Sequence, residues 1–222
     1  MITFDGIEIG SVAKVYVEDI KVSDVDYSPV TRPRPIDSGA LFVRNRANTR
    51  TVTVTFALLK QDRNARQAAL TALNAWAKTD KEYKLEVEGH PDHYLMAVCT
   101  EKPSPSLRQW WEQKLRFVFT CYDNPFWTSN QEKVVACGTQ FVVLGDAPPL
   151  MTIQATGNSF ALDGRTMAFS SASGSVIDLN TQTVTPSSVM SGYNVTSKWL
   201  IPRTGTQTIS GSGTIKYRER WS

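Results

Sequence analysis

The chain contains 222 residues, a length that fits one large or two ordinary domains. Hydrophobic residues make up 41% of it, which is enough to fill a real core and excludes a globally disordered protein. The 24 basic and 21 acidic residues nearly balance, and this argues against an obligatory nucleic-acid or membrane partner. No apolar run approaches the roughly 18 residues of a membrane span, so we expect no membrane insertion.

The N-terminal segment is predicted to form β-strands. Asp5-Gly6 is a strong signal for a hairpin turn, and it lies between two short apolar segments at 2–4 and 7–9. Side chains alternate again in residues 14–27, which favours a further strand.

A segment rich in proline and arginine follows. Pro29, Pro33 and Pro35 remove backbone donors and fix an extended course, so we expect an arm rather than a strand of a ladder. Arginines at positions 32, 34, 44, 46 and 50 make the arm and its return basic. The arm is either a solvated loop or a contact with a neighbouring subunit. In the second case its interface residues are Pro29, Arg32, Pro33, Arg34 and Pro35.

The stretch 50–79 has the clearest pattern in the chain. Apolar residues alternate with threonines over 51–58, which predicts a strand with one buried face. Asp62 then starts a segment with apolar residues at spacings of three and four, which predicts an N-capped amphipathic helix through Thr79. A single amphipathic helix among strands must bury its apolar face against a sheet, so the first domain is expected to be α+β.

Further strands are predicted at 83–87, 93–99 and 115–121. Trp110 and Trp111 precede the last of these, and adjacent strand residues point to opposite faces, so at most one of the two belongs to the core. The other could stack on a sugar or anchor a protein interface, and we favour the interface for this domain. Composition changes soon afterwards, which places a first domain at 1–128 and a second at 129–222.

The second domain is poor in charge and rich in Gly, Ser and Thr. Short strand candidates separated by turn residues are typical of a β-sandwich, and no helix is predicted in this half. The candidates are 134–136, 140–144, 151–156, 160–162, 166–169, 175–179, 182–184, 198–201, 207–210 and 214–221.

Residues for catalysis or for binding metals and cofactors are not identified. His90 and His93 lie in one turn with Asp92, but no other histidine and no cysteine pair at ligand spacing accompanies them. Neither a nucleophile elbow nor a glycine-rich phosphate loop before a helix occurs. Cys121 is in register with the apolar residues of its strand, so it is read as a reduced core thiol. We therefore predict no cofactor, no metal site and no enzymatic activity.

The order of these segments resembles that of the distal tail (Dit) proteins of siphovirus-type bacteriophages, which join the tail tube to the tail tip. The resemblance covers essentially the whole chain. It lies in the order of many motifs, each of which is weak by itself. The arm departs at Ser38 from the family's usual glycine-rich turn. The matching segments are Ile-Thr-Phe-Asp-Gly-Ile at 2–7, Asp-Ser-Gly-Ala-Leu at 37–41, Arg-Thr-Val-Thr-Val-Thr-Phe-Ala-Leu at 50–58, Leu-Asn-Ala-Trp at 73–76, Pro-Asp-His-Tyr-Leu-Met-Ala-Val at 91–98, Phe-Val-Phe-Thr-Cys at 117–121, Asn-Pro-Phe-Trp at 124–127 and Gly-Thr-Ile-Lys-Tyr-Arg-Glu-Arg-Trp at 213–221.

The resemblance implies a mainly β protein with a structural role in the virion. The first domain would be a tail-tube-like β-sheet or split barrel with one covering helix. It would close into a homo-hexameric ring through which DNA passes without sequence-specific binding. The second domain would be a galectin-like β-sandwich that projects toward receptor-binding proteins. Tail tube and tail-tip proteins would be the other partners, and assembly would take place in the host cytoplasm.

A carbohydrate-binding protein is the alternative from another functional class. Trp199 or an exposed Tyr193 in the second domain could stack on a sugar ring, although a core position is favoured for both.

Overall fold

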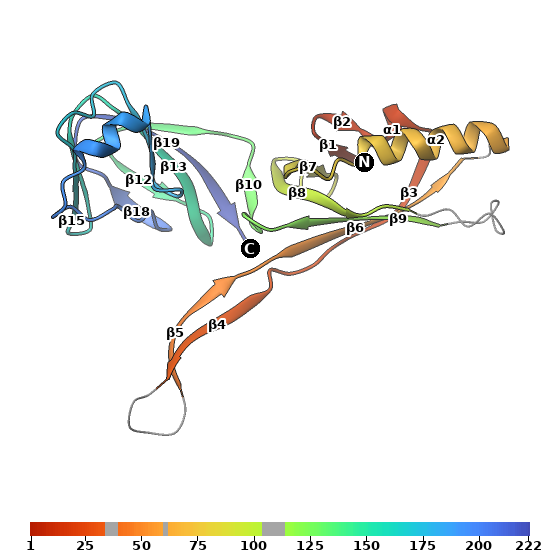
Figure 1. Cartoon of the computed structure of the whole chain (residues 1–222), viewed down its shortest axis with the longest axis horizontal. Helices are drawn as coiled ribbons and strands as arrows, with labels where there is room; N and C mark the ends of the chain where they lie inside the picture. The colour runs from red at the N-terminus through yellow and green to blue at the C-terminus, as the bar shows by residue number, and fades with distance from the viewer. Residues whose placement is uncertain (34–39, 60–61, 104–113) are drawn as a thin grey trace. The chain divides into compact units, whose positions relative to one another are not determined.

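The computed structural model describes residues 1–33, 40–59, 62–103 and 114–222. The chain divides into two compact units, Met1–Phe126 and Trp127–Ser222 (Figure 1). Each unit is described by itself below. The described chain is mainly β-structure, in agreement with the fold class predicted from the sequence.

The first unit combines strands with two helices in the described residues. Its elements are β1 (Ile2–Phe4), β2 (Ile7–Glu8), α1 (Ile9–Val12), β3 (Val15–Val22), β4 (Tyr27–Pro33), β5 (Ala40–Ala47), β6 (Arg50–Leu58), α2 (Arg63–Trp76), β7 (Tyr83–Val87), β8 (His93–Glu101) and β9 (Leu115–Cys121).

The predicted N-terminal hairpin is present as β1 and β2. Asp5 and Gly6 have φ angles of 52° and 75°, the positive values that a two-residue turn between twisted strands needs. The second strand is shorter than expected because Ile9 starts the single helical turn α1, which is closed by a hydrogen bond from Ala13 N to Ile9 O.

Strand β6 and helix α2 confirm the central prediction. Buried and half-buried residues alternate along β6 without interruption, as a strand with one face in the core requires. Asp62 caps α2 by accepting a hydrogen bond from Ala65 N at 2.8 Å. The helix ends at Trp76, whose ring lies edge-on to Phe117 and Phe119 of β9, so α2 covers the face of the sheet that β6 and β9 share.

The sheet of the first unit is open. Its strands follow the order β2-β1-β7-β8-β9-β6-β3, all antiparallel. Within the described residues β2 and β3 form its two edges, and the sheet does not close into a barrel. One face holds the core beneath α2, and the opposite face carries the half-buried side chains.

The second unit is built from short strands. Its elements are β10 (Trp127–Ser129), β11 (Lys133–Ala136), β12 (Gln140–Val143), β13 (Ala147–Ala155), β14 (Ser159–Leu162), β15 (Arg165–Ala168), β16 (Val176–Asp178), β17 (Thr183–Thr185), the 3-10 helix η1 (Ser187–Gly192), β18 (Gly205–Thr208) and β19 (Gly213–Trp221).

The C-terminal strand β19 lies at the centre of this unit. It pairs with β13 on one side and with β10 and β11 on the other, and β13 continues to β16 and β17. Two further ladders, β12–β18 and β14–β15, complete the unit. The side chains that they bury form one hydrophobic core that includes Phe141, Ile153, Phe160 and Ile215.

Two sequence predictions for this unit are wrong. Residues 198–201 belong to no strand: the neighbouring side chains of Trp199 and Leu200 are half-buried and buried, so this segment lacks the alternation of a strand. The helix η1 was not expected, because a 3-10 helix of six residues is too short to show apolar periodicity. None of the helices in the described ranges is long and apolar enough to cross a membrane.

Candidate assembly interface

The proline-rich arm is one strand of a β-hairpin, which corrects the prediction that it would not join a ladder. Strand β4 pairs with β5 in an antiparallel register that places Pro29 opposite Asn45 and Pro33 opposite Ala40. Pro29 and Pro33 are four residues apart, so their nitrogens face the same edge of the strand. A two-stranded ladder leaves an outer edge without a partner on each strand, and prolines are tolerated there.

The hairpin continues the β3–β6 ladder and is fastened at its base. Backbone hydrogen bonds join Ser23 to Thr51 and Asp26 to Asn48 across the junction. The side chain of Asn48 also donates to Asp26 Oδ2 at 2.9 Å and to Ser28 Oγ at 2.5 Å. In Figure 1 β4 and β5 run beyond the ends of β3 and β6 as a two-stranded ribbon. In the described part of the chain, β4 and β5 pair only with each other.

The two faces of the hairpin differ in chemistry. Cross-strand partners share a face, so the pairs Tyr27–Ala47 and Thr31–Phe42 lie on the same side as Pro29. This apolar face exposes 47% of Tyr27 and 57% of Phe42.

The opposite face of the hairpin is basic. Ser28 pairs with Arg46 and Val30 with Arg44, and Arg32 follows on the same side of β4. Val30 is half-buried among these three exposed arginines. Within the described chain, no ion pair or hydrogen bond of their guanidinium groups occurs. These three charges therefore have no neutralising partner among the described residues.

Arg50 does not belong to this basic surface, although the sequence grouped it with the arm. It is the first residue of β6, points to the same side as Val52, and is only 3% exposed.

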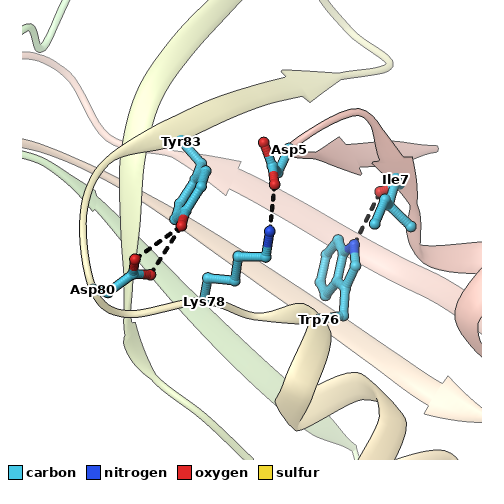
Figure 2. Close-up of polar contacts among 6 residues, drawn as sticks. All are labelled: Asp5, Ile7, Trp76, Lys78, Asp80 and Tyr83. Atoms are coloured by element: carbon cyan, nitrogen blue, oxygen red, sulfur yellow. Dashed lines mark hydrogen bonds and ion pairs between the residues drawn. The ribbon is translucent and has the colours of Figure 1, made fainter.

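A second surface feature lies at the loop after α2 and the residues that follow β9. The loop after α2 is held by polar contacts that Figure 2 shows: Lys78 Nζ lies 2.5 Å from Asp5 Oδ2, and Tyr83 Oη donates to the carboxylate of Asp80 at 2.9 Å. The contact with Asp5 raises the pKa of Lys78. The hydrogen bond from Tyr83 lowers the pKa of Asp80, while burial and that same bond raise the pKa of Tyr83. All three pKa shifts favour the protonation states that these contacts need at neutral pH: a charged Lys78, a charged Asp80 and a protonated Tyr83.

The held loop borders a depression of about 590 Å³. Its apolar floor comes from the uncovered side of β8 and from Tyr122, which is 54% exposed. Three carboxylates and one lysine stand around the floor. The lining residues are Thr79, Asp80, Lys81, Glu82, Met96, Val98, Tyr122 and Asp123.

Glu82 fixes the wall of this depression. Its Oε1 accepts hydrogen bonds from the backbone nitrogens of Tyr122 and Asp123, at 2.5 and 3.2 Å. The end of β9 is thereby tied to the loop after α2, so the depression is a built feature rather than a gap between unconnected loops. No sequence pattern predicted it, because its residues come from three separate segments.

Several predicted site residues lie outside the described residues, namely Arg34 and Pro35 of the arm and the pair Trp110 and Trp111.

His90 and His93 lie in one turn, with a hydrogen bond from His93 N to His90 O. In the described ranges, His, Cys, Asp and Glu side chains do not gather in groups of three or more that could hold a metal ion. Burial raises the pKa of the Cys121 thiol to about 12, as a core cysteine requires.

The aromatic residues proposed for sugar stacking pack on one another. The rings of Tyr193 and Trp199 lie 5.7 Å apart, and both contact Phe169, at 5.4 and 6.4 Å between centroids. Trp199 Nε1 also donates to Leu179 O at 3.2 Å. This geometry favours a core role for both residues over a sugar platform.

Comparisons with known proteins give a fold match over the whole chain. No protein-family model and no curated relative matches the sequence. A solved structure described as the Dit protein of phage SPP1, "a paradigm of hub adsorption apparatus in Gram-positive infecting phages", superimposes with a TM-score of 0.73 at 14% identity, covering 100% of this chain and 98% of the other. A chain of the phage P2 baseplate in its activated conformation with calcium matches with a TM-score of 0.51 at 8% identity, covering 94% and 91% of the two chains. The protein is built on the fold of a Dit-type phage tail hub protein.

Proposed function

We propose that this protein is a structural hub of a phage tail tip or baseplate. Copies of the first unit assemble into a hexameric ring that joins the tail tube to the tail-tip and receptor-binding apparatus and lets DNA pass through its lumen. The observation that carries the proposal is a full-length match, at a TM-score of 0.73, to a protein described as a hub of an adsorption apparatus. The second chain with this fold comes from a phage baseplate.

The hairpin supports self-assembly on physical grounds. A two-stranded ribbon that leaves Tyr27 and Phe42 about half exposed has surface suited to burial against a partner. A ring consists of heterologous contacts that close, and a projecting element reaches the next subunit with little added surface.

Charges on the uncovered face of the sheet suit a surface that DNA slides past. Away from the depression beside β8, charged side chains on this face pair with one another: Lys84 with Glu86 at 2.7 Å, Arg116 with Glu101 at 2.6 Å, and Lys21 with Asp19 at 3.6 Å. Threonines of β6 separate the pair on β3 from the pair that joins β8 and β9. A neutralised face does not accumulate contacts with phosphates, and each such contact would strengthen binding to DNA.

Negative-stain electron microscopy of the purified full-length chain at physiological salt tests the proposal. Rings with a central opening are the expected result. Particles of single-chain size at micromolar concentration would contradict it.

A further inference from the structure

We propose that the basic face of the β4–β5 hairpin of one copy docks into the acidic depression of a second copy, and that this contact links neighbouring subunits. The proposal rests on the function given above and names the two surfaces that would meet. The basic face consists of Val30, Arg32, Arg44 and Arg46. The acidic depression is the one lined by residues 79–82, Met96, Val98, Tyr122 and Asp123.

The two surfaces complement each other in charge. The hairpin presents three exposed arginines without ion-pair partners in the described residues. The depression presents the carboxylates of Asp80, Glu82 and Asp123 against the single ammonium group of Lys81. Opposite charges on two surfaces of one molecule steer copies together and fix their orientation.

The two surfaces also share one layout. Val30 lies at the centre of the basic face, with arginines around it. The floor of the depression is Met96, Val98 and the ring of Tyr122, with carboxylates around it. An apolar centre inside a polar rim is the usual anatomy of a protein interface, and the exposed Tyr122 ring can also receive a guanidinium group.

A second copy, rather than the same chain, is the occupant. In the described chain no ion pair joins β4 or β5 to the lining of the depression. The hairpin continues β3 and β6, whereas the depression is formed on β8 and by the residues after α2 and β9. Because the two surfaces differ, each copy offers one and receives the other, which is a head-to-tail contact that can close into a ring.

Charge reversal on each surface, followed by a charge swap, tests the proposal. The variants of the full chain are Arg44→Glu with Arg46→Glu on the hairpin, Asp80→Arg with Asp123→Arg at the depression, and all four together. Glu82 stays unchanged because it holds the wall. Replacing Asp80 removes its contact with Tyr83, but the Lys78–Asp5 ion pair, which no variant touches, still holds the loop. Arg165→Glu with Lys198→Glu, two exposed positions in the second unit, is the matched control. Circular dichroism and thermal melting check that each variant folds.

Sedimentation velocity measures self-association, and fluorescence anisotropy measures affinity for a random DNA duplex. We expect each double reversal to weaken self-association about tenfold or more, the quadruple variant to recover most of the loss, and the control to match the natural protein. If the natural protein self-associates and the depression variant self-associates equally well, this contact is overturned. The proposed hub function is not affected by that result.

Two other results also contradict the docking proposal. If self-association of the quadruple variant is weakened by the sum of the losses in the two double variants, the two surfaces do not meet. A hairpin reversal that lowers DNA affinity without changing self-association would assign the basic face to nucleic acid. A natural protein that never associates would instead overturn the proposed function itself.

Discussion

The indole nitrogen of Trp76 donates a hydrogen bond to the backbone oxygen of Ile7, with 2.9 Å between the two atoms (Figure 2). The bond ties the last residue of α2 to the strand that follows the Asp5-Gly6 turn. The same ring contacts Phe4 and Phe117 in the core. One side chain therefore joins the helix, the N-terminal hairpin and the sheet of the first unit.

Replacing Trp76 tests how much this junction contributes to stability. Trp76→Phe keeps an aromatic ring but leaves the oxygen of Ile7 without its donor, so we expect a loss of about 1–3 kcal/mol in the free energy of unfolding. Trp76→Ala also leaves a cavity and should cost about 3–5 kcal/mol. Urea denaturation followed for the first unit measures both. Leu59→Ala, at a residue that is 49% exposed, is the control, and a control loss as large as that of Trp76→Ala would contradict this account.

Glu219 should have a comparable role in the second unit. Its side chain is 6% exposed, and one oxygen accepts hydrogen bonds from Leu144 N and from Lys133 Nζ, both at 2.8 Å. Glu219→Ala leaves both donors unpaired, and we expect a loss of about 1.5–3 kcal/mol.

Two further variants separate the contributions of Glu219. Glu219→Gln keeps a side-chain oxygen that can accept the hydrogen bond from Leu144 N, so it should lose less stability than Glu219→Ala. Glu132→Ala removes an exposed ion pair with Arg218 at 3.7 Å and should change stability by less than about 1 kcal/mol. Thermal unfolding of the second unit is the measurement. Equal losses for Glu219→Ala and Glu132→Ala would contradict the assignment.

The buried thiols of the first unit predict a loss of stability at high pH. Burial raises the pKa of Cys99 to about 11 and that of Cys121 to about 12, from an ordinary value of 9.0. Above pH 9 the unfolded chain releases these protons while the folded chain keeps them, so stability falls as pH rises from about 9 toward 12.

Cys121→Ala isolates this effect. The variant is less stable at neutral pH because it loses packing, but its urea midpoint should fall less steeply between about pH 8 and about pH 10.5. Cys137→Ala, in the second unit, should leave the pH dependence of the first unit's urea midpoint unchanged. Identical slopes for the natural protein and Cys121→Ala would contradict the prediction.

Removing the hairpin should separate assembly from folding. Ser28 and Arg46 are cross-strand partners, so an Asn-Gly turn can replace residues 29–45 and join the two strands directly. The hydrogen bonds of Asn48 and Asp26 remain, and we expect the melting temperature of the first unit to stay within a few degrees of the natural value while self-association is lost. Sedimentation velocity and thermal melting measure the two effects. Unchanged self-association would reject the role of the hairpin.

Much of the fold could be predicted from local sequence. Asp5-Gly6 marked a turn because few dipeptides adopt two successive positive φ angles. Asp62 and the apolar spacing after it marked the start of α2. Alternation along residues 50–58 identified β6 because a strand with one buried face requires it.

The remaining features depend on contacts between distant residues. The prolines of β4 argued against a ladder, and only the pairing with β5 shows that they can occupy an outer edge. Arg50 was grouped with the arm by sequence proximity, but its register in β6 turns it inward. The acidic depression joins residues near 80, 97 and 122, and no single segment reveals that they meet.

Native mass spectrometry of the full-length protein at micromolar concentration tests the central claim most directly. A closed hub predicts a dominant species whose mass is six times that of the 24.7 kDa chain, with few open intermediates, because ring closure adds one contact beyond those of a linear hexamer. A spectrum that contains only the 24.7 kDa chain would contradict the account.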